Sequence, residues 1–298
     1  MKFNKIKSSH FLFSLLELVL EIRDLFRSIR GIMSRVIVIT SGKGGVGKTT
    51  VTANLGMHLA KQNFRVCLID MDIGLNNLDV VMNVEDRVMY TMIDVIENRC
   101  RLKEAMVQDE YYPLLYLLSS GGLNQNLHIQ ISQIKQIVYE LQSLCDFILI
   151  DCPAGIDAGF KRAVSCADEA LVVTTPHLSS VRDADKVVTI LTSYNIMNKR
   201  FVINRARGDL IQDKVMFDVY DVGKTLGIDF GGVIPEDDKI IETSSESIDN
   251  KKYACNRAFE ILANNVVKGE KKLFDCTYKY KGFIGSIKKI LKRSVWWI

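Results

Sequence analysis

A glycine-rich segment carries the clearest chemistry in this 298-residue chain, and it follows an apolar, β-branched run at Val36–Thr40. The segment fits the pattern G-x-x-x-x-G-K-[ST], and its members are Gly42, Lys43, Gly44, Gly45, Val46, Gly47, Lys48 and Thr49, with Thr50 directly after. Glycines allow tight curvature, so successive backbone N–H groups can point at phosphate oxygens, and the following helix adds its positive N-terminal dipole. In this pattern the Lys48 ammonium reaches the β- and γ-phosphates and the Thr49 hydroxyl binds Mg²⁺. We therefore expect a site for a nucleotide with Mg²⁺.

Aspartates stand at the ends of two further apolar runs. Asp70 ends the run Val66–Asp70, and Asp72 follows it closely. Two carboxylates at a strand end, followed by glycine, indicate a metal-and-water site, although an exposed turn is the alternative. Asp151 ends the run Phe147–Asp151 and fits a Walker B role, in which a carboxylate holds Mg²⁺ through a water.

Strand and helix patterns alternate through residues 34–269. Short β-branched runs lie at Val36–Thr40, Val66–Asp70, Leu114–Leu118, Phe147–Asp151, Ala170–Thr175, Phe201–Asn204 and Gly232–Ile234. Helix-period segments lie between them, for example at Lys48–Gln62, Gln130–Leu144, Ser179–Tyr194 and Lys252–Val267. Near-continuous apolar strands separated by helices indicate a parallel sheet that is buried on both faces. We expect an α/β fold with a doubly wound, mostly parallel sheet, whose ligands bind outside the carboxyl ends of the strands.

A second lysine in the loop makes the pattern more specific. The sequence K-G-G-x-G-K-T-T, which begins at Lys43, resembles the signature of the deviant Walker A family of P-loop ATPases, which includes MinD, ParA and the nitrogenase iron protein. In that family the first lysine reaches across a nucleotide-sandwiched dimer to the partner's phosphates. The resemblance implies an ATP hydrolase that forms a homodimer on binding ATP. It also implies that Lys43 neutralises transition-state charge in trans, as an arginine finger does.

The same resemblance assigns roles to the remaining site residues. Asp72 would orient the attacking water, and Asp70 would support the Mg²⁺ shell or Lys43. Asn204 stands at a strand end, where its amide would pair with an adenine edge, although a turn or cap role is the alternative. Pro235, within Val233–Asp237, would form the other wall of the base pocket.

The C-terminal tail differs from the rest of the chain in charge. The formal net charge is +4, yet residues 268–298 hold nine cationic side chains against Glu270 and Asp275, so the remainder is slightly acidic. Turned as a helix, residues 281–298 place on one face Phe283, Ile284, Ile287, Ile290, Leu291, Val295 and Ile298. The basic side chains fall on the other face, and two tryptophans end the chain: Lys288, Lys289, Lys292, Arg293, Trp296 and Trp297. This pattern is typical of a helix that lies in an anionic membrane surface, and a helix docked on its own domain is the alternative.

We therefore divide the chain into a leader (1–33), a P-loop ATPase domain (34–269), a linker (270–280) and a membrane-targeting helix (281–298). The leader has an amphipathic pattern, and its acidic residues argue against a transit peptide; it is either an added helix or an upstream extension before Met33. Seven cysteines without a CxxC pair favour a reducing compartment and indicate neither a disulfide framework nor a zinc site.

Within the family, the tail favours the MinD-like branch, as do the stretches Gly74–Asp79 and Ser179–Asp185. That likeness implies an ATP-bound dimer that binds membrane, recruits a MinC-like division inhibitor and is released when a MinE-like activator stimulates hydrolysis. Asn76 stands where several relatives carry arginine, which leaves partner contacts open. The alternative is a ParA-type ATPase that partitions DNA or plasmids, although we expect no nucleic-acid partner.

The composition is rich in Lys, Ile and Asn and poor in Pro, which is typical of AT-rich genomes, including plastid ones. We expect peripheral membrane and soluble pools in a chloroplast stroma, with a bacterial cytoplasm as the alternative.

Overall fold

The computed structural model describes residues 34–74, 77–122, 129–240, 253–282 and 285, and Arg35–Ile298 forms one unit of the chain. The predicted leader (1–33) lies outside the described residues, and so do all the side chains predicted to contact a membrane in the tail.

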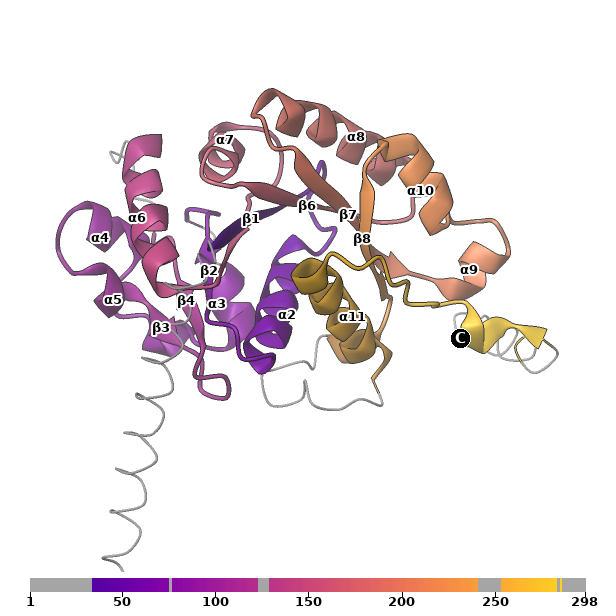
Figure 1. The fold of residues 1–298 in the computed structure, drawn as a ribbon, viewed down its shortest axis with the longest axis horizontal. Coiled ribbons are helices and arrows are strands. Elements are labelled where there is room, and N and C mark those ends of the chain that lie inside the picture. Colours follow the sequence, from indigo (N-terminus) through magenta and orange to yellow (C-terminus); the bar gives the residue numbers. More distant parts are fainter. Residues whose placement is uncertain (1–33, 75–76, 123–128, 241–252, 283–284, 286–298) are drawn as a thin grey trace, which may run out of the picture. The chain divides into compact units, whose positions relative to one another are not determined.

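Within the described residues, eight strands form a single sheet in the order β3-β4-β2-β5-β1-β6-β7-β8 (Figure 1). Their bounds are β1 Arg35–Thr40, β2 Val66–Asp70, β3 Val107–Gln108, β4 Leu115–Leu118, β5 Phe147–Asp151, β6 Glu169–Thr174, β7 Asn198–Ala206 and β8 Asp229–Pro235. All neighbouring strands are parallel except β3, which pairs antiparallel with β4. The predicted doubly wound, mostly parallel sheet is confirmed; the two-residue β3 was not predicted.

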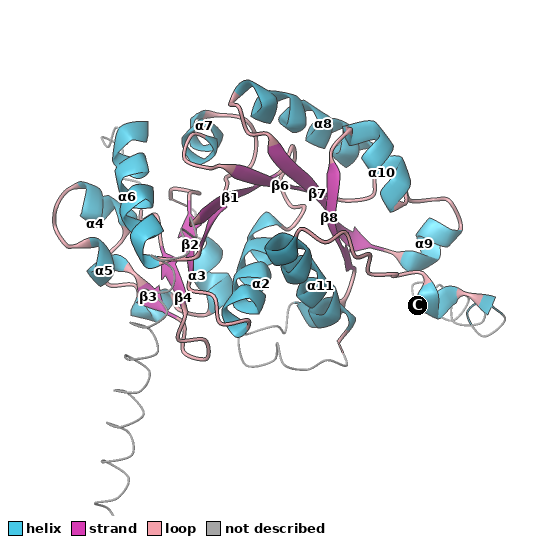
Figure 2. Ribbon diagram, viewed as in Figure 1, coloured by secondary structure: helices cyan, strands magenta, loops and turns pink. Residues whose placement is uncertain are grey.

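Helices cover both faces of this sheet (Figure 2). Their bounds are α2 Lys48–Lys61, α3 Asn77–Met82, α4 Met92–Ile96, α5 Leu102–Ala105, α6 Ile131–Leu144, α7 Ala158–Val164, α8 Leu178–Ser193, α9 Gly208–Gln212, α10 Val219–Leu226 and α11 Ala254–Lys268. The described residues also form three short 3₁₀ segments: η1 Glu85–Arg87, η2 Asp238–Ile240 and η3 Tyr278–Tyr280.

The strand β1 shows how the core is divided. Val36 and Val38 pack into one buried cluster with α6, α7 and α8, whereas Ile37 and Ile39 pack into a second cluster with α2 and α11. Successive side chains of a strand point to opposite faces, so a strand covered on both sides must be apolar at every position. This is why the sequence shows continuous apolar runs here rather than alternation.

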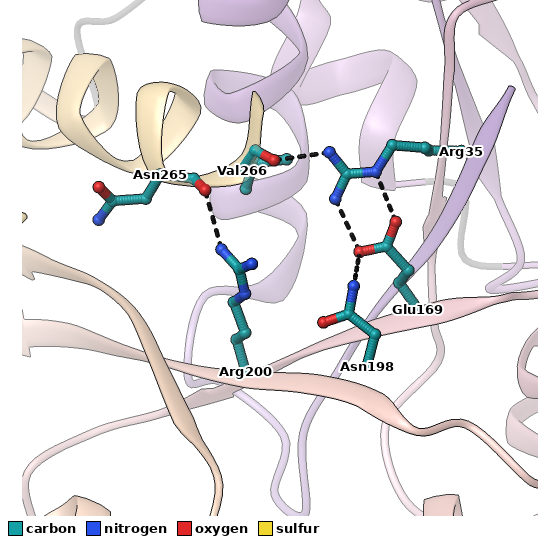
Figure 3. Close-up of polar contacts among 6 residues, drawn as sticks. All are labelled: Arg35, Glu169, Asn198, Arg200, Asn265 and Val266. Carbon is teal, nitrogen blue, oxygen red and sulfur yellow. Dashed lines mark hydrogen bonds and ion pairs between the residues drawn. The ribbon is translucent and has the colours of Figure 1, made fainter. Parts of the chain in front are cut away.

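A polar network joins the starting ends of β1, β6 and β7 to the end of α11 (Figure 3). The Arg35 guanidinium donates two hydrogen bonds to the Glu169 carboxylate, one of them 2.7 Å long, and a third to the Val266 carbonyl at 2.6 Å. Arg200 donates to the Asn265 carbonyl at 2.8 Å, and Asn198 donates to Glu169. The last carbonyls of a helix have no partner within the helix, so the two arginines satisfy groups that would otherwise be orphaned.

The chain after α11 lies against the domain, and we call residues 269–281 the C-terminal strap. The side chain of Asn265 holds its start: the amide donates to the carbonyls of Gly231 (2.8 Å) and Lys272 (2.9 Å), and the oxygen accepts from the Lys272 N–H (3.0 Å). Farther along, a Cβ on Gly208 would lie 2.1 Å from the Cys276 carbonyl oxygen, so strap and α9 are in close contact. The segment predicted to be a linker is therefore packed on α9 and held by α11.

Candidate nucleotide site

The glycine-rich segment forms a tight loop between β1 and α2. Gly45 and Gly47 have φ angles of 74° and 90°, a region that side-chain-bearing residues rarely adopt, and Gly47 is the residue that precedes the first turn of α2. The Ser41 hydroxyl donates to the Lys43 carbonyl at 2.8 Å and stabilises the curve. The loop therefore presents the N-terminus of a 14-residue helix to any anion bound there.

The two lysines of the loop occupy different environments. Lys48 is buried, with 8% of its surface exposed, at the first position of α2. Lys43 is exposed, as are Gly44 and Gly45 beside it. One lysine is thus buried within its own domain, and the other is open to solvent.

Asp151 lies at the end of β5 and faces the first turn of α2. Its carboxylate accepts a 2.7 Å hydrogen bond from the Thr49 hydroxyl, and its other oxygen lies 3.2 Å from the hydroxyl of Thr52. Burial raises the pKa of the Asp151 carboxyl to about 7, opposed by the Thr49 hydrogen bond, and the negative charge of Asp70 raises it further. Thr52 was not singled out in the sequence, although its spacing of three from Thr49 places both hydroxyls on one side of the helix.

Asp70 is brought beside Asp151 by the pairing of β2 with β5, in which the two residues are register partners. Its carboxylate is almost fully buried and accepts from two backbone N–H groups of the following segment, those of Asp72 (2.8 Å) and Leu78 (3.1 Å). Burial raises the pKa of Asp70 to about 6, and the two hydrogen bonds lower it. In this structure Asp70 therefore organises the segment that carries Asp72.

Asp72 is half-buried at the start of that segment. Gly74, with a φ of 96°, donates to the Gly121 carbonyl at 3.2 Å, which ties the segment to the loop after β4. The predicted group of Lys48, Thr49, Asp70, Asp72 and Asp151 thus gathers at the carboxyl ends of β1, β2 and β5, where a parallel sheet binds its ligands.

The predicted base-site residues lie at the ends of the neighbouring strands β7 and β8. Asn204 is buried, and its amide donates to the Val46 carbonyl at 2.8 Å. A Cβ on Gly47 would lie 2.3 Å from the same amide nitrogen, so the loop needs glycine there on steric grounds as well. Pro235 is buried at the end of β8 and is the register partner of Ala206. In this structure the Asn204 amide therefore supports the loop itself; its predicted pairing with adenine remains a prediction.

A contact that the sequence did not reveal joins the loop to α8. A Cβ on Gly42 would lie 2.1 Å from the carbonyl oxygen of Asp183 and 2.7 Å from its Cβ. Any shift of the loop at Gly42 must therefore be accommodated by α8. Leu178, at the start of the same helix, is half exposed.

The donor set fits a magnesium ion. Mg²⁺ binds in proteins through one or two oxygen ligands and keeps several waters together with substrate phosphates. The Thr49 hydroxyl and the Asp151 carboxylate supply such oxygens at the mouth of the loop. Among the described residues there is no group of three or more His, Cys, Asp and Glu side chains that could hold a metal ion.

A buried cysteine stands next to Asp151. Burial raises the pKa of the Cys152 thiol, next to Asp151, to about 12, so the thiol stays protonated at neutral pH. None of the seven cysteines forms a disulfide. Among the described residues no helix is long and apolar enough to cross a membrane.

Comparisons with known proteins agree with this geometry. Residues 37–249 match the model of the CobQ/CobB/MinD/ParA nucleotide binding domain. The septum site-determining protein MinD of Bacillus subtilis (strain 168) is 43% identical over 262 residues, which cover 86% of this chain and 97% of that protein. A MinD relative from Chlorella vulgaris is 42% identical over 262 residues, covering 86% and 93%. A chain of the MinC:MinD cell division protein complex of Aquifex aeolicus is 38% identical with a TM-score of 0.74, covering 80% of this chain and 98% of that one.

The family model spans most of the chain, and the relatives match it over nearly their whole length. This protein therefore belongs to the MinD/ParA family of P-loop nucleotide-binding ATPases, on the branch of the septum site-determining MinD proteins.

Proposed function

We propose that this protein is a Mg²⁺-dependent ATPase that closes into a dimer over ATP, binds a membrane in that state and helps to place the division septum. The observation that carries the proposal is the different exposure of the two lysines in the loop. Lys48 is buried against its own site, whereas Lys43 is exposed at the rim of the same loop. This exposure supports the proposal that Lys43 acts on the nucleotide of a second subunit.

The site residues then have distinct tasks. Backbone N–H groups of Gly44–Thr49 cradle the phosphates, and Lys48 neutralises their charge. The Thr49 hydroxyl would hold Mg²⁺ directly and Asp151 would hold it through a water, and the ion would supply charge neutralisation at the phosphates. Asp70 fixes the backbone of the segment that carries Asp72, and Asp72 orients the attacking water. Lys43 of each subunit stabilises the transition-state charge in the other.

Membrane binding would come from residues 281–298. One short amphipathic helix binds lipid marginally, whereas two linked helices gain by effective concentration, on the order of 10²-fold. Dimer closure therefore couples ATP binding to membrane binding, and hydrolysis reverses it. The structural relative from Aquifex aeolicus is a MinC:MinD complex, which supports a MinC-like division inhibitor as one partner; a MinE-like activator is the second partner that we expect. Relatives from Chlorella vulgaris and Bacillus subtilis support a chloroplast stroma or a bacterial cytoplasm as the location, and the composition favours the former.

ATP turnover by loop variants tests the trans role of Lys43. We expect Lys43→Ala to bind ATP but to lose turnover by on the order of 10³-fold, as loss of an arginine finger does. The matched control is Lys103→Ala, which removes an exposed lysine on α5 and should leave turnover unchanged. Mixing Lys43→Ala with Asp72→Asn should restore about a quarter of the wild-type rate, because half of the mixed dimers are heterodimers with one intact site. No recovery on mixing would place Lys43 in its own subunit's site.

Co-sedimentation with anionic vesicles tests the membrane step. We expect the full chain to pellet with vesicles in ATP but not in ADP, and deletion of residues 281–298 to abolish pelleting. Equal pelleting in ATP and ADP would contradict the coupling to dimerisation. ATP-dependent pelleting with DNA, without lipid binding, would move the protein to the partition branch of the family.

A further inference from the structure

A groove of about 420 Å³ opens at the β8 edge of the sheet, far along the sheet from the phosphate loop. It is bounded by α10, the start of β8 and the C-terminal strap. Its apolar wall is made by Phe201, Val219, Ile228, Phe230 and Leu273. The rings of Phe201 and Phe230 pack edge to face with centroids 5.7 Å apart, which gives the groove a firm aromatic floor. The volume falls within the range of pockets that hold small amphiphiles.

Large hydrophobic side chains remain exposed at the mouth of the groove. Tyr220 of α10 is 78% exposed, and Leu273 of the strap is 44% exposed. Both side chains line the groove, so they extend its apolar wall to the surface. A tyrosine with an apolar ring and a polar tip also suits a lipid–water boundary.

The charged groups on the rim decide which amphiphile fits. Lys224 is exposed and forms no ion pair within the described part of the chain. Lys271 lies across the groove, with its ammonium 2.8 Å from the Asp229 carboxylate. The lining therefore carries a net positive charge. It repels a basic helix such as the chain's own tail and attracts an anionic head group.

The C-terminal strap joins the groove to the start of the proposed membrane helix. It supplies Lys271 and Leu273 to the groove and continues to Lys281, whose ammonium lies 2.7 Å from the Asp275 carboxylate. From Leu273 to Lys281 the chain advances by eight residues, which span at most about 28 Å when fully extended. A membrane engaged by residues 281–298 is therefore tethered close to the groove.

We propose that this groove binds one anionic membrane lipid, with an acyl chain against Phe201 and Phe230 and the head group beside Lys224. The site rests on the proposed membrane binding and adds to it a specific lipid contact on the folded domain. It would select anionic over zwitterionic lipids and fix the orientation of the domain on the surface.

Gly223 offers a way to fill the groove without disturbing the fold. It lies inside α10, and a Cβ there would make ordinary contact with the Phe201 ring at 3.5 Å. Gly223→Leu should fill the groove, whereas Gly223→Ala adds a methyl group at the same place and favours the helix. Lys224→Gln removes the rim charge, and Lys103→Gln is its control on a distant exposed helix.

Photo-crosslinking tests the proposal. The full chain is bound, in the presence of ATP, to vesicles of phosphatidylglycerol and phosphatidylcholine. The probe is phosphatidylglycerol with a diazirine in one acyl chain. We expect crosslinks to peptides that contain residues 219–224 and 271–273, in addition to crosslinks in the tail. Gly223→Leu should lower the groove crosslinks at least fivefold and leave those of the tail unchanged, and Gly223→Ala should keep both. Lys224→Gln should lower them about threefold, and a phosphatidylcholine probe should label the groove weakly.

Each contrary result has a separate meaning. Tail crosslinks without groove crosslinks, or groove crosslinks that Gly223→Leu leaves intact, would overturn the lipid site while the proposed function stands. Loss of both would overturn the two together. Equal labelling by phosphatidylcholine would contradict the proposed contact between an anionic head group and Lys224. Crosslinks between tail and groove in vesicle-free protein would show that the occupant is the chain's own helix.

Discussion

Charged side chains are paired within the chain at one end of the parallel strands and are incompletely paired at the other. At the amino ends, Arg35 donates hydrogen bonds to the Glu169 carboxylate and to the Val266 carbonyl at the end of α11 (Figure 3). At the carboxyl ends, Asp70 and Asp151 are buried side by side, and burial raises the pKa of each, to about 6 and about 7. One end of the sheet contains a polar network that is complete within the chain. The other contains buried charge that a bound cation and phosphates would complete.

This contrast separates stability from function within one sheet. Buried carboxylates that lack a full set of counter-charges destabilise the empty protein, whereas mutually bonded ions at the opposite end stabilise it. Variants that remove a charged side chain at the carboxyl ends should therefore damage activity more than stability, and variants that remove one at the amino ends should do the reverse.

The largest effect is expected from Asp151→Asn, which should lower ATP turnover by on the order of 10³-fold because the carboxylate that would hold Mg²⁺ through a water is lost. The same change should stabilise the empty protein by about 2 kcal/mol at pH 8. A carboxyl whose pKa is raised on folding binds its proton more tightly in the folded state, so its destabilising effect is full above about pH 7 and fades toward pH 4. Urea unfolding in EDTA without nucleotide, at pH 5 and pH 8, measures this.

Glu110→Gln is the control, because it removes an exposed carboxylate and should show no such pH-dependent gain. A stability loss for Asp151→Asn at pH 8 would mean that the carboxylate is satisfied within the chain and that the contrast between the two ends is wrong.

Gly42→Ala should have the next largest effect, this time on the folded loop itself. The added methyl group would lie 2.1 Å from the Asp183 carbonyl oxygen, so the loop or α8 must move. We expect the free energy of unfolding to fall by about 3 kcal/mol, within the range for overpacking and strain. Gly44→Ala is the matched control, because a Cβ there meets only the Ala154 methyl at 3.7 Å and should cost less than about 1 kcal/mol. Equal losses of unfolding free energy for both variants would show that the close contact between Gly42 and α8 has no special effect on stability.

The sequence predicted the parts of this fold that depend on local pattern. Buried parallel strands are continuous apolar runs, so β2 and β5 were predicted to the residue, and the long helices α2 and α6 to within one residue. The strand β7 is longer than predicted. It begins at Asn198, whose polar side chain belongs to the amino-end network, so the apolar pattern did not reveal its start. The two residues of β3 and the short helices such as α9 give no periodicity that a pattern could detect.

The site divides in the same way. The phosphate loop is contiguous in sequence, so its residues could be named in advance. The contact of Gly42 with Asp183 and the network of Arg35, Glu169 and Val266 join residues that are distant in the chain, and only the fold brings them together. The packed strap could not be predicted either, because the contacts that hold its start depend on a single buried side chain, that of Asn265.

Glu169→Ala tests the amino ends of the strands. It leaves the Arg35 guanidinium without its carboxylate and removes the hydrogen bond from Asn198. Because both partners are mostly buried, we expect a loss of about 2 kcal/mol in the free energy of unfolding. ATP turnover per folded molecule should stay within about twofold of wild type, since additive effects are usual at this separation from the site. Glu169→Gln, which retains hydrogen-bonding oxygen, should lose less. A large fall in turnover at temperatures where the protein is fully folded would show that the two ends are coupled.

The smallest effect is expected from Asn265→Ala, and it should be local. The change removes the donor to the Gly231 and Lys272 carbonyls and the acceptor for the Lys272 N–H, at a cost of about 1–2 kcal/mol. The carbonyl of residue 265 still accepts from Arg200, so α11 should stay in place while the strap is released. Hydrogen exchange followed by mass spectrometry should show faster exchange in residues 270–276 and unchanged exchange in α11. Asn264→Ala, on the exposed side of the same helix, is the control and should change neither. If exchange in α11 rises together with that of the strap, the arginines alone do not hold the helix end, and the amino-end network extends through Asn265 into the segment that leads to the tail.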